Sequence, residues 1–217
     1  MLIGENSKVV MIGDSVTDAG RDHPYGEGRG EAIGKSYVGI VEAWLTSVYP
    51  ERNIRVINMG ISGNKTRDLL NRWQTDVIDL KPDWVTLMIG INDIWRQFDK
   101  PLQKEIHVYI DEYEANMIKL IEETLKVTKN LVIISPIFME LNKEDAMRNA
   151  ADRYTEVCRK LAEKYGLIFV DAQSKYDEFL KYRHPMSISW DRVHPNQMGH
   201  TIIARSILNA LEFDWNK

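Results

Sequence analysis

Two short segments near opposite ends of the sequence carry the residue types of a nucleophilic hydrolase. Gly13-Asp14-Ser15 follows an apolar run, and a serine hydroxyl there can attack a carbonyl once a base takes its proton. Asp191 and His194 lie close together in a later loop, where the carboxylate can orient the imidazole toward a hydroxyl. Taken alone, Ser15 is better explained as a turn or capping residue, and a single loop histidine is usually a surface residue.

Candidate donors for a negatively charged oxygen stand between these two segments. The stretch 58–64 contains Gly60 and Gly63, whose exposed backbone N–H groups suit an oxyanion. In Gly90-Ile91-Asn92-Asp93, the side chain of Asn92 can aim an amide at the same point. A plain strand-to-helix turn and an Asx turn remain the local alternatives for these two stretches.

Alternating apolar runs and helical patterns predict the elements that position these residues. Strands are expected at residues 8–12, 54–58, 84–89, 131–134 and 167–170. Helices are expected at residues 37–49, 66–80, 146–164, 174–182 and 197–211, with a further long helix opening at residue 111. Asp111 and Glu114 suggest a capping box, and Asn196 is expected to cap the last helix. Residues 16–35 are expected as a loop, with Ser15 presented before any helix.

This alternation indicates an α/β fold with a parallel sheet, in which ligands bind beyond the carboxyl ends of the strands. Ser15 follows the first predicted strand, Gly63 the second and Asn92 the third, while Asp191 and His194 precede the last helix. All of these positions fall on one edge of the sheet. A turn, capping or surface role explains each of these residues separately. That all of them occur together by chance is improbable, so the sequence predicts a serine hydrolase.

Composition excludes several other classes of function. The 217 residues allow a single domain over residues 1–217, and the net charge of -4 lacks the basic surplus of a nucleic-acid binder. No apolar run reaches the length of a membrane span and no secretory leader is recognisable, so we expect a cytoplasmic protein without a membrane partner. The single Cys158 excludes an internal disulfide, and the histidines lack metal-ligand spacing. The glycine-rich stretch 26–30 lacks the Gly-Lys-Ser/Thr ending of a phosphate loop.

The four blocks resemble the SGNH hydrolases, the GDSL-type esterases and lipases, which are named for one Ser, Gly, Asn and His. The matching residues are Ser15, Gly63, Asn92 and His194, in order, and the resemblance spans residues 8–211. One departure is Val16, where the namesake block has leucine. The resemblance implies a flavodoxin-like three-layer α/β/α sandwich with about five parallel strands.

The resemblance also implies roles for the site residues. Ser15 would be the nucleophile, His194 the base and Asp191 its orienting partner. The oxyanion hole would consist of the Ser15 and Gly63 backbone N–H groups and the Asn92 side chain. Two further carboxylates, Asp14 and Asp93, would support the site without taking part in the chemistry. No metal or organic cofactor is needed by this family.

Several stretches are similar to those of bacterial intracellular acetylxylan esterases of this fold, notably residues 26–28, 81–85, 91–97 and 189–195. This resemblance implies deacetylation of short xylo-oligosaccharides in xylan degradation, and a homo-oligomer. Trp95 and Trp190 could stack on sugar rings, although core or interface packing explains them equally well. Asn64 and Arg96 could hold substrate hydroxyls, with a surface role at least as well supported.

Two rival functions stay open. A thioesterase or lysophospholipase of the same fold would need a long apolar acyl tunnel, which the polar residues 95–97 mildly disfavour. A catalytically silent interaction module would have no need to keep Ser15, Asp191 and His194 together. Comparing acetyl with long-chain esters separates the first rival, and a fluorophosphonate label on Ser15 separates the second.

Overall fold

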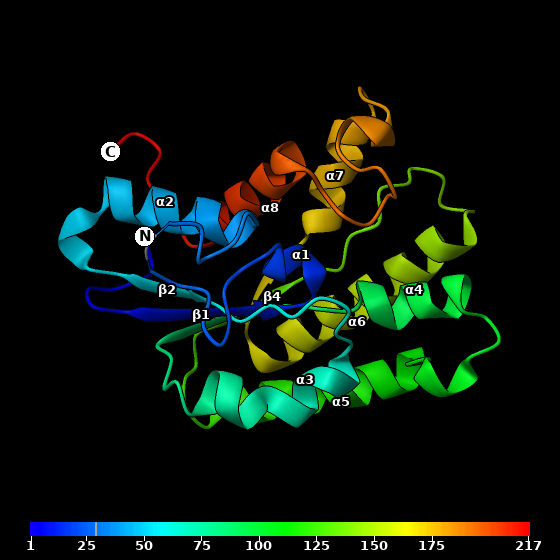
Figure 1. Ribbon diagram of the computed structural model, residues 1–217, viewed down its shortest axis with the longest axis horizontal. Helices are drawn as coiled ribbons and strands as arrows, with labels where there is room; N and C mark the ends of the chain where they lie inside the picture. The colour runs from blue at the N-terminus through cyan, green and yellow to red at the C-terminus, as the bar shows by residue number, and fades with distance from the viewer. Residues whose placement is uncertain (29) are drawn as a thin grey trace.

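The computed structural model describes residues 1–28 and 30–217, so Arg29, within the expected loop and the glycine-rich stretch 26–30, lies outside the described residues. One sheet of five strands has the order β2-β1-β3-β4-β5, and every neighbouring pair is parallel (Figure 1). The strands are β1 Lys8–Gly13, β2 Arg55–Asn58, β3 Trp84–Met88, β4 Leu131–Ile134 and β5 Ile168–Val170. The expected strands and their parallel arrangement are confirmed.

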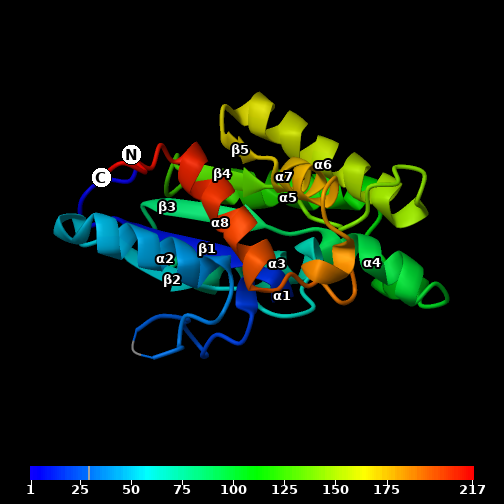
Figure 2. The ribbon, with the colours of Figure 1, turned by 90° about the horizontal axis from the view of Figure 1, so that it is seen from above.

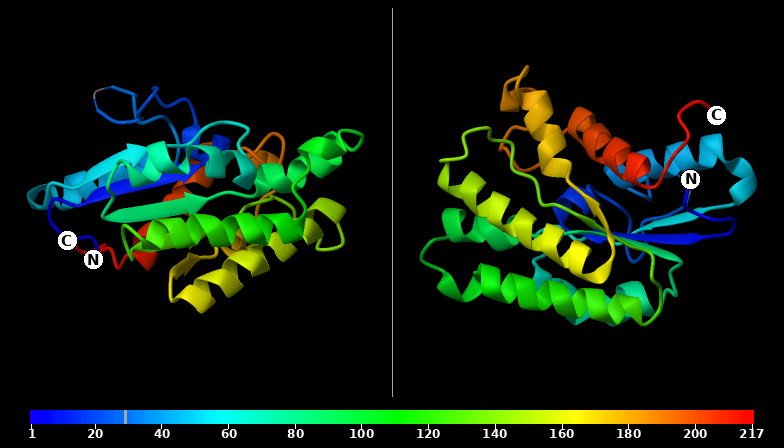
Figure 3. Two further views of the ribbon diagram at one scale, coloured as in Figure 1. Left: turned by 90° about the horizontal axis from the view of Figure 1, so that it is seen from below. Right: turned by 180° about the vertical axis from the view of Figure 1, so that it is seen from behind.

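Helices cover both faces of the sheet, because its strands are apolar on both sides. Val10 and Ile12 of β1 belong to one buried cluster with α3, α5 and α6, whereas Val9 and Met11 belong to another with α2, α7 and α8. Figure 1 and the view from behind in Figure 3 show these two helical layers on opposite sides of the sheet, and Figure 2 looks down onto the layer that contains α2 and α8. The molecule is therefore the three-layer α/β/α sandwich that was expected.

The helices begin and end close to the expected positions in most cases. Their bounds are α1 Ser15–Asp18, α2 Tyr37–Val48, α3 Thr66–Trp73, α4 Ile91–Asp99, α5 Ile110–Leu125, α6 Ala146–Tyr165, α7 Ala172–Leu180 and α8 Gln197–Ala210. Asn196 caps α8 as expected, since its side chain accepts the N–H groups of Met198 and Gly199. Both chain ends lie together, where the Leu2 N–H donates to the Leu211 carbonyl (Figure 1).

Four local expectations were wrong. The loop expected from residue 16 begins with the short helix α1, so Ser15 starts a helix and does not precede one. The expected helix 66–80 continues after α3 as a π-helical turn, Gln74–Ile78. Asp111 does not cap α5, because Tyr109 occupies the N-cap position. The helix α4 was not expected, since Asn92 and Asp93 after a glycine favour a turn.

Within the described ranges, no helix is long and apolar enough to cross a membrane.

Candidate active site

The end of β1 forces a tight turn that exposes Ser15. A Cβ at Gly13 would lie 2.3 Å from the carbonyl oxygen of Met88 on β3, so only glycine fits there. Asp14 then caps α1 by accepting the backbone N–H of Val16 at 2.9 Å. Ser15 consequently stands at the carboxyl edge of the sheet, where the parallel fold places its chemistry.

Ser15, His194 and Asp191 form one continuous chain of hydrogen bonds. The Ser15 Oγ lies 2.9 Å from His194 Nε2, and His194 Nδ1 lies 2.6 Å from Asp191 Oδ2. The other carboxylate oxygen of Asp191 accepts the backbone N–H groups of His194 and Val193 at 2.8 and 2.9 Å. Burial alone would raise the pKa of Asp191, but these hydrogen bonds outweigh it and hold the pKa below its usual value. An ionised Asp191 keeps the Nδ1 proton in place and leaves Nε2 to accept from the serine hydroxyl.

The loop that carries the Asp–His pair is tied to the segment after β4. Arg192 adopts a positive φ of 66°, and its carbonyl accepts the backbone N–H of Met139 at 2.9 Å. Its guanidinium donates to Glu140 Oε2 at 2.9 Å. Ser189 and Pro195 close the loop through an isolated antiparallel bridge. These contacts fix the path of the chain on both sides of the imidazole.

The loop after β2 is held against α1 through buried polar side chains. Asn58 is fully buried, and it donates to backbone carbonyls of α1 while accepting the Gly60 N–H at 2.9 Å. Asp18 accepts both the backbone N–H and the hydroxyl of Ser62, at 2.9 and 2.6 Å. A Cβ at Gly60 would lie 2.2 Å from the Asp18 nitrogen, so the approach requires glycine. Gly63 follows in the left-handed region with φ of +82°. Sequence reasoning missed Asp18 and Asn58.

Asn92 lies in the first turn of α4, on the same edge of the sheet. It is buried, its Nδ2 donates to the Asn64 carbonyl at 3.1 Å, and its Oδ1 accepts from the Arg96 guanidinium at 3.0 Å. Gly90 permits the sharp entry into α4 with φ of +134°. The candidate substrate contacts Asn64 and Arg96 therefore both touch Asn92 in the structure.

The two carboxyls that were predicted to support the site, Asp14 and Asp93, are both buried. Burial raises the pKa of each to about 7, although each accepts hydrogen bonds that lower it. The Asp93 carboxyl accepts the backbone N–H of Thr66 at 3.1 Å and its hydroxyl at 2.6 Å, which joins α4 to the start of α3. The charge of Asp93 adds to the upward shift in the Asp14 pKa. Both carboxyls accept hydrogen bonds from the first turn of a helix, Asp14 from α1 and Asp93 from α3.

Two tryptophans flank the imidazole. Trp95 meets His194 edge-on with ring centroids 5.7 Å apart, and Trp190 lies parallel to it at 6.4 Å with an interplanar angle of 10°. A cavity of about 290 Å³ opens beside Trp95, lined by Trp95, Phe98, Asp99, Asp145, Ala146, Met147 and Arg192. Trp95 thus lies between His194 and a cavity that is lined in part by charged side chains.

Arg72 was missed by sequence reasoning, yet it joins the loops after β1 and β2. Its guanidinium donates to the Gly13 carbonyl at 3.1 Å, the Met59 carbonyl at 2.8 Å and Asn64 Oδ1 at 2.8 Å. Asp76, one turn later, pairs with it at 2.6 Å. The sequence spacing of Arg72 and Asp76 predicts this charge pair. It does not predict which backbone carbonyls the Arg72 guanidinium contacts.

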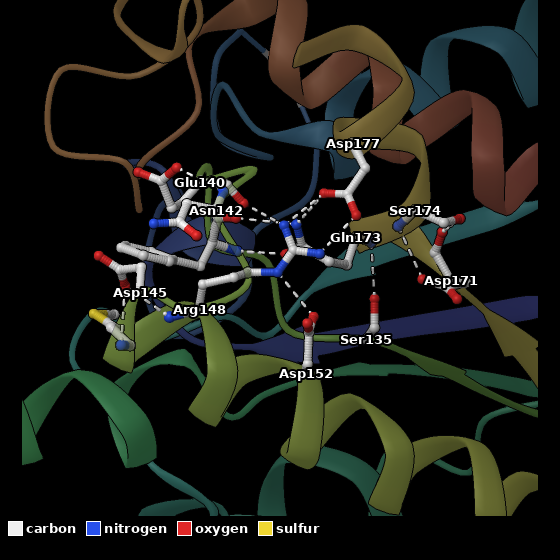
Figure 4. Close-up of polar contacts among 12 residues, drawn as sticks. Ser135, Glu140, Asn142, Asp145, Arg148, Asp152, Asp171, Gln173, Ser174 and Asp177 are labelled. Atoms are coloured by element: carbon white, nitrogen blue, oxygen red, sulfur yellow. Dashed lines mark hydrogen bonds and ion pairs between the residues drawn. The ribbon is translucent and has the colours of Figure 1, made fainter. Parts of the chain in front are cut away.

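A second arginine, Arg148 on α6, was also missed (Figure 4). Its side chain is 1% exposed, and it donates to both oxygens of Asp177 on α7 at 2.7 and 2.6 Å. It also pairs with Asp152 at 2.8 Å and donates to the Glu140 carbonyl. Gln173 donates to the same Asp177 at 2.9 Å. This network, shown at the centre of Figure 4, fixes the segment that anchors the Asp–His loop.

Other titratable side chains lie outside this arrangement. Burial, with a smaller contribution from the nearby His194 charge, lowers the pKa of His200 to about 4. Burial raises the pKa of Cys158 to about 12, which favours the inert thiol. Across residues 1–28 and 30–217, no group of three or more His, Cys, Asp or Glu side chains is arranged to hold a metal ion.

A serine, a histidine and an aspartate that are joined by hydrogen bonds at the carboxyl edge of a parallel sheet define a hydrolase site. Comparison with known proteins leads to the same class. The GDSL-like Lipase/Acylhydrolase family matches residues 11–202, and the chain belongs to that family. The family resemblance drawn from the four sequence blocks is thereby confirmed.

The individual relatives are similar over nearly the whole chain. An acetylxylan esterase of Geobacillus stearothermophilus is 49% identical over 215 residues, covering 99% of this chain and 98% of that one. The crystal structure of Axe2, an acetylxylan esterase from the same organism, matches with a TM-score of 0.97 over 99% of this chain and 98% of that one, at 49% identity. LAE5, an alpha/beta hydrolase enzyme from the metagenome of Lake Arreo, is 47% identical with a TM-score of 0.96, covering 98% of each chain.

Axe2 has also been solved as the catalytic mutants S15A, D191A and H194A. These three residue types stand at the same numbers in this chain.

Proposed function

We propose that this protein is a serine esterase that removes acetyl groups from acetylated xylo-oligosaccharides. The observation that carries the proposal is the chain of contacts from Ser15 Oγ to His194 at 2.9 Å and on to Asp191 at 2.6 Å. The similarity to acetylxylan esterases over almost the full length supports the choice of substrate.

In this proposal, His194 takes the Ser15 proton while Oγ attacks the acetyl carbonyl carbon. The carbonyl oxygen becomes an oxyanion that accepts hydrogen bonds from the Ser15 and Gly63 N–H groups and from the Asn92 amide. The tetrahedral intermediate collapses, the sugar hydroxyl leaves with the proton from His194, and acetyl-Ser15 remains. Asp191 stabilises the imidazolium while it carries that proton.

Water then completes the cycle. His194 takes a proton from a water molecule, whose oxygen attacks the acetyl carbonyl of acetyl-Ser15, and the same donors hold the second oxyanion. The bond from the carbonyl carbon to Ser15 Oγ breaks, His194 returns its proton to Ser15, and acetic acid leaves and ionises to acetate in water. No cofactor takes part in this sequence.

The sugar is proposed to lie between the two tryptophans on the solvent side of the histidine. Trp190 is 81% exposed and Trp95 borders the cavity of about 290 Å³. Aromatic faces suit the apolar faces of pyranose rings, and Asp99 and Asp145 offer carboxylates to sugar hydroxyls. The same charged groups disfavour a long acyl chain, which argues against the thioesterase or lysophospholipase alternative.

We also propose that the protein acts in the cytoplasm as a homo-oligomer. Both statements follow from the resemblance of residues 26–28, 81–85, 91–97 and 189–195 to bacterial intracellular acetylxylan esterases. Trp44 and Trp215, with ring centroids 5.3 Å apart, present a partly exposed aromatic surface of the kind that interfaces use. Light scattering coupled to size exclusion would test the assembly, and a monomer at micromolar concentration would contradict it.

The proposed activity is tested by acetate release from acetylated xylo-oligosaccharides, with 4-nitrophenyl octanoate and palmitate as the competing substrates. We expect release from the sugars that disappears in Ser15→Ala. Turnover confined to the long-chain esters would retain the serine mechanism and overturn the substrate. Release that persists in Ser15→Ala would overturn the mechanism.

A further inference from the structure

The two ends of the Asn92 amide are held by partners of opposite type. Its nitrogen donates to the Asn64 carbonyl at 3.1 Å, and its oxygen accepts from the Arg96 guanidinium at 3.0 Å. The side chain is 2% exposed, so few other partners compete for either end. The amide therefore sits between one fixed acceptor and one fixed donor.

These two partners decide which end of the amide faces the reaction. A primary amide has nearly the same shape when rotated by about 180°, so packing alone barely distinguishes its oxygen from its nitrogen. In the rotated form, the amide oxygen of Asn92 would face the Asn64 carbonyl and its nitrogen would face the Arg96 guanidinium. Both contacts would then be repulsive. In the observed orientation, one N–H of the Asn92 amide donates to the Asn64 carbonyl and the other remains available to an oxyanion.

Arg96 is itself fixed by its neighbours on α4. Its guanidinium pairs with the Asp99 carboxylate one turn further on and lies 4.7 Å from the centre of the Trp95 ring. Its side chain is 20% exposed. Because Asn92 and Arg96 are four residues apart on one helix, their contact depends on little besides the helix.

We propose that Arg96 is a positioning residue that locks the Asn92 amide with its nitrogen toward the oxyanion. This inference rests on the proposed function, in which Asn92 is an oxyanion donor. Without Arg96, only the Asn64 carbonyl opposes rotation of the Asn92 amide, so more molecules present the amide oxygen to the developing negative charge. Arg96 acts through Asn92 and need not touch the substrate.

The test uses 4-nitrophenyl acetate, which carries no sugar, so that contacts of Arg96 with xylose hydroxyls cannot contribute. Values of kcat and KM are measured for Arg96→Met, Arg96→Lys, Asn92→Ala and the double variant Arg96→Met/Asn92→Ala. Arg159→Met, on α6, is the matched control because Arg159 pairs with Asp171 and lies over Phe169, away from these residues. Circular dichroism and thermal melting check that each variant is folded.

An oxyanion donor is worth on the order of 10² to 10³ in kcat, so we expect Arg96→Met to lower kcat by about tenfold or more. KM should stay within about twofold, because the loss falls on the transition state. Arg96→Lys, which can still donate a hydrogen bond and pair with Asp99, should recover part of kcat. In the Asn92→Ala background, Arg96→Met should change kcat by less than about threefold.

Other results would overturn the proposal. If Arg96→Met lowers kcat by the same factor with and without Asn92, Arg96 does not act through Asn92. A loss confined to KM would indicate a binding role. If Asn92→Ala keeps kcat near that of the wild type, Asn92 is no oxyanion donor and the positioning role falls with it. Failure of the proposed function would appear separately, as a wild-type protein that releases no acetate from acetylated xylo-oligosaccharides, or as activity that survives in Ser15→Ala.

Discussion

The ring of Trp190 lies parallel to the imidazole of His194, with centroids 6.4 Å apart, although Trp190 is 81% exposed to solvent. A large aromatic side chain at a site gains little from packing when most of it faces water. The arrangement places the indole beside the imidazole and leaves most of its surface open to solvent.

Replacing Trp190 with alanine should therefore weaken the handling of sugar substrates more than that of small esters. Stacking of an aromatic ring contributes about 1 kcal/mol, and the buried contact area of the indole adds to it. Since about 1.4 kcal/mol corresponds to a factor of ten, we expect kcat/KM on acetylated xylo-oligosaccharides to fall about tenfold. The loss on 4-nitrophenyl acetate should be much smaller. Parallel kinetics on the two substrates check this, with Tyr182→Ala as the control at a similarly exposed aromatic side chain. Equal losses on both substrates would point to a structural role.

Asp191→Asn should abolish most activity while leaving the fold intact. An asparagine keeps an oxygen for the backbone N–H groups of Val193 and His194, but it loses the charge that stabilises the imidazolium. Neutralising the equivalent carboxylate in serine hydrolases lowers kcat by about 10⁴. Steady-state kinetics with melting curves would check this, and Asp22→Asn, at an exposed aspartate, serves as the control. A loss below about tenfold would remove Asp191 from the mechanism.

The two buried carboxyls, Asp14 and Asp93, predict how stability depends on pH. Each has a pKa of about 7 in the folded state against a model-peptide value of 3.8, so between these pH values the folded state keeps protons that the unfolded state has lost. The free energy of unfolding should therefore fall as pH rises from about 4 to about 7. Asp93→Asn removes one of the two groups that bind a proton in the folded state and lose it on unfolding.

The loss of stability between pH 4.5 and pH 8 should consequently be smaller in Asp93→Asn than in the wild type. Urea denaturation at several pH values measures it, and Asp22→Asn should leave the pH dependence unchanged. An unaltered slope in Asp93→Asn would mean that Asp93 is ionised in the folded protein throughout this range.

The strands and the Asp–His spacing were predictable because they depend on local patterns. Continuous apolar runs such as residues 8–12 identify buried parallel strands, and Asp191 and His194 meet within one short loop. The turn at Gly13 was also readable, since a glycine ending a buried strand favours close approach of the backbone. Each of these features is decided by residues near one another in the sequence.

The helix α4 and the contacts that it creates were not predictable in the same way. Gly90 followed by Asn92 and Asp93 has the composition of a turn, and only tertiary packing makes this stretch helical. Once it is helical, Arg96 reaches Asn92 and Trp95 reaches His194. The roles of Trp95 and Trp190 were left open because a tryptophan has the same sequence pattern whether it packs inside or faces a ligand.

The buried position of Arg148 depends on a contact 29 residues away, with Asp177, which no local pattern contains. Its side chain is 1% exposed and pairs with Asp177 and Asp152. Replacing it with methionine would leave the partly buried carboxylate of Asp177 without a cationic partner and with only the Gln173 amide as a donor, and breaking a buried pair costs about 3–5 kcal/mol. We expect Arg148→Met to lower the free energy of unfolding by about that amount, measured by urea denaturation, while Arg159→Met at a half-exposed pair changes it by less than about 1 kcal/mol.

Because the network also anchors the segment that supports the Asp–His loop, kcat should fall in Arg148→Met even under conditions where the variant is fully folded. A stable, fully active Arg148→Met would show that the loop is held without this network.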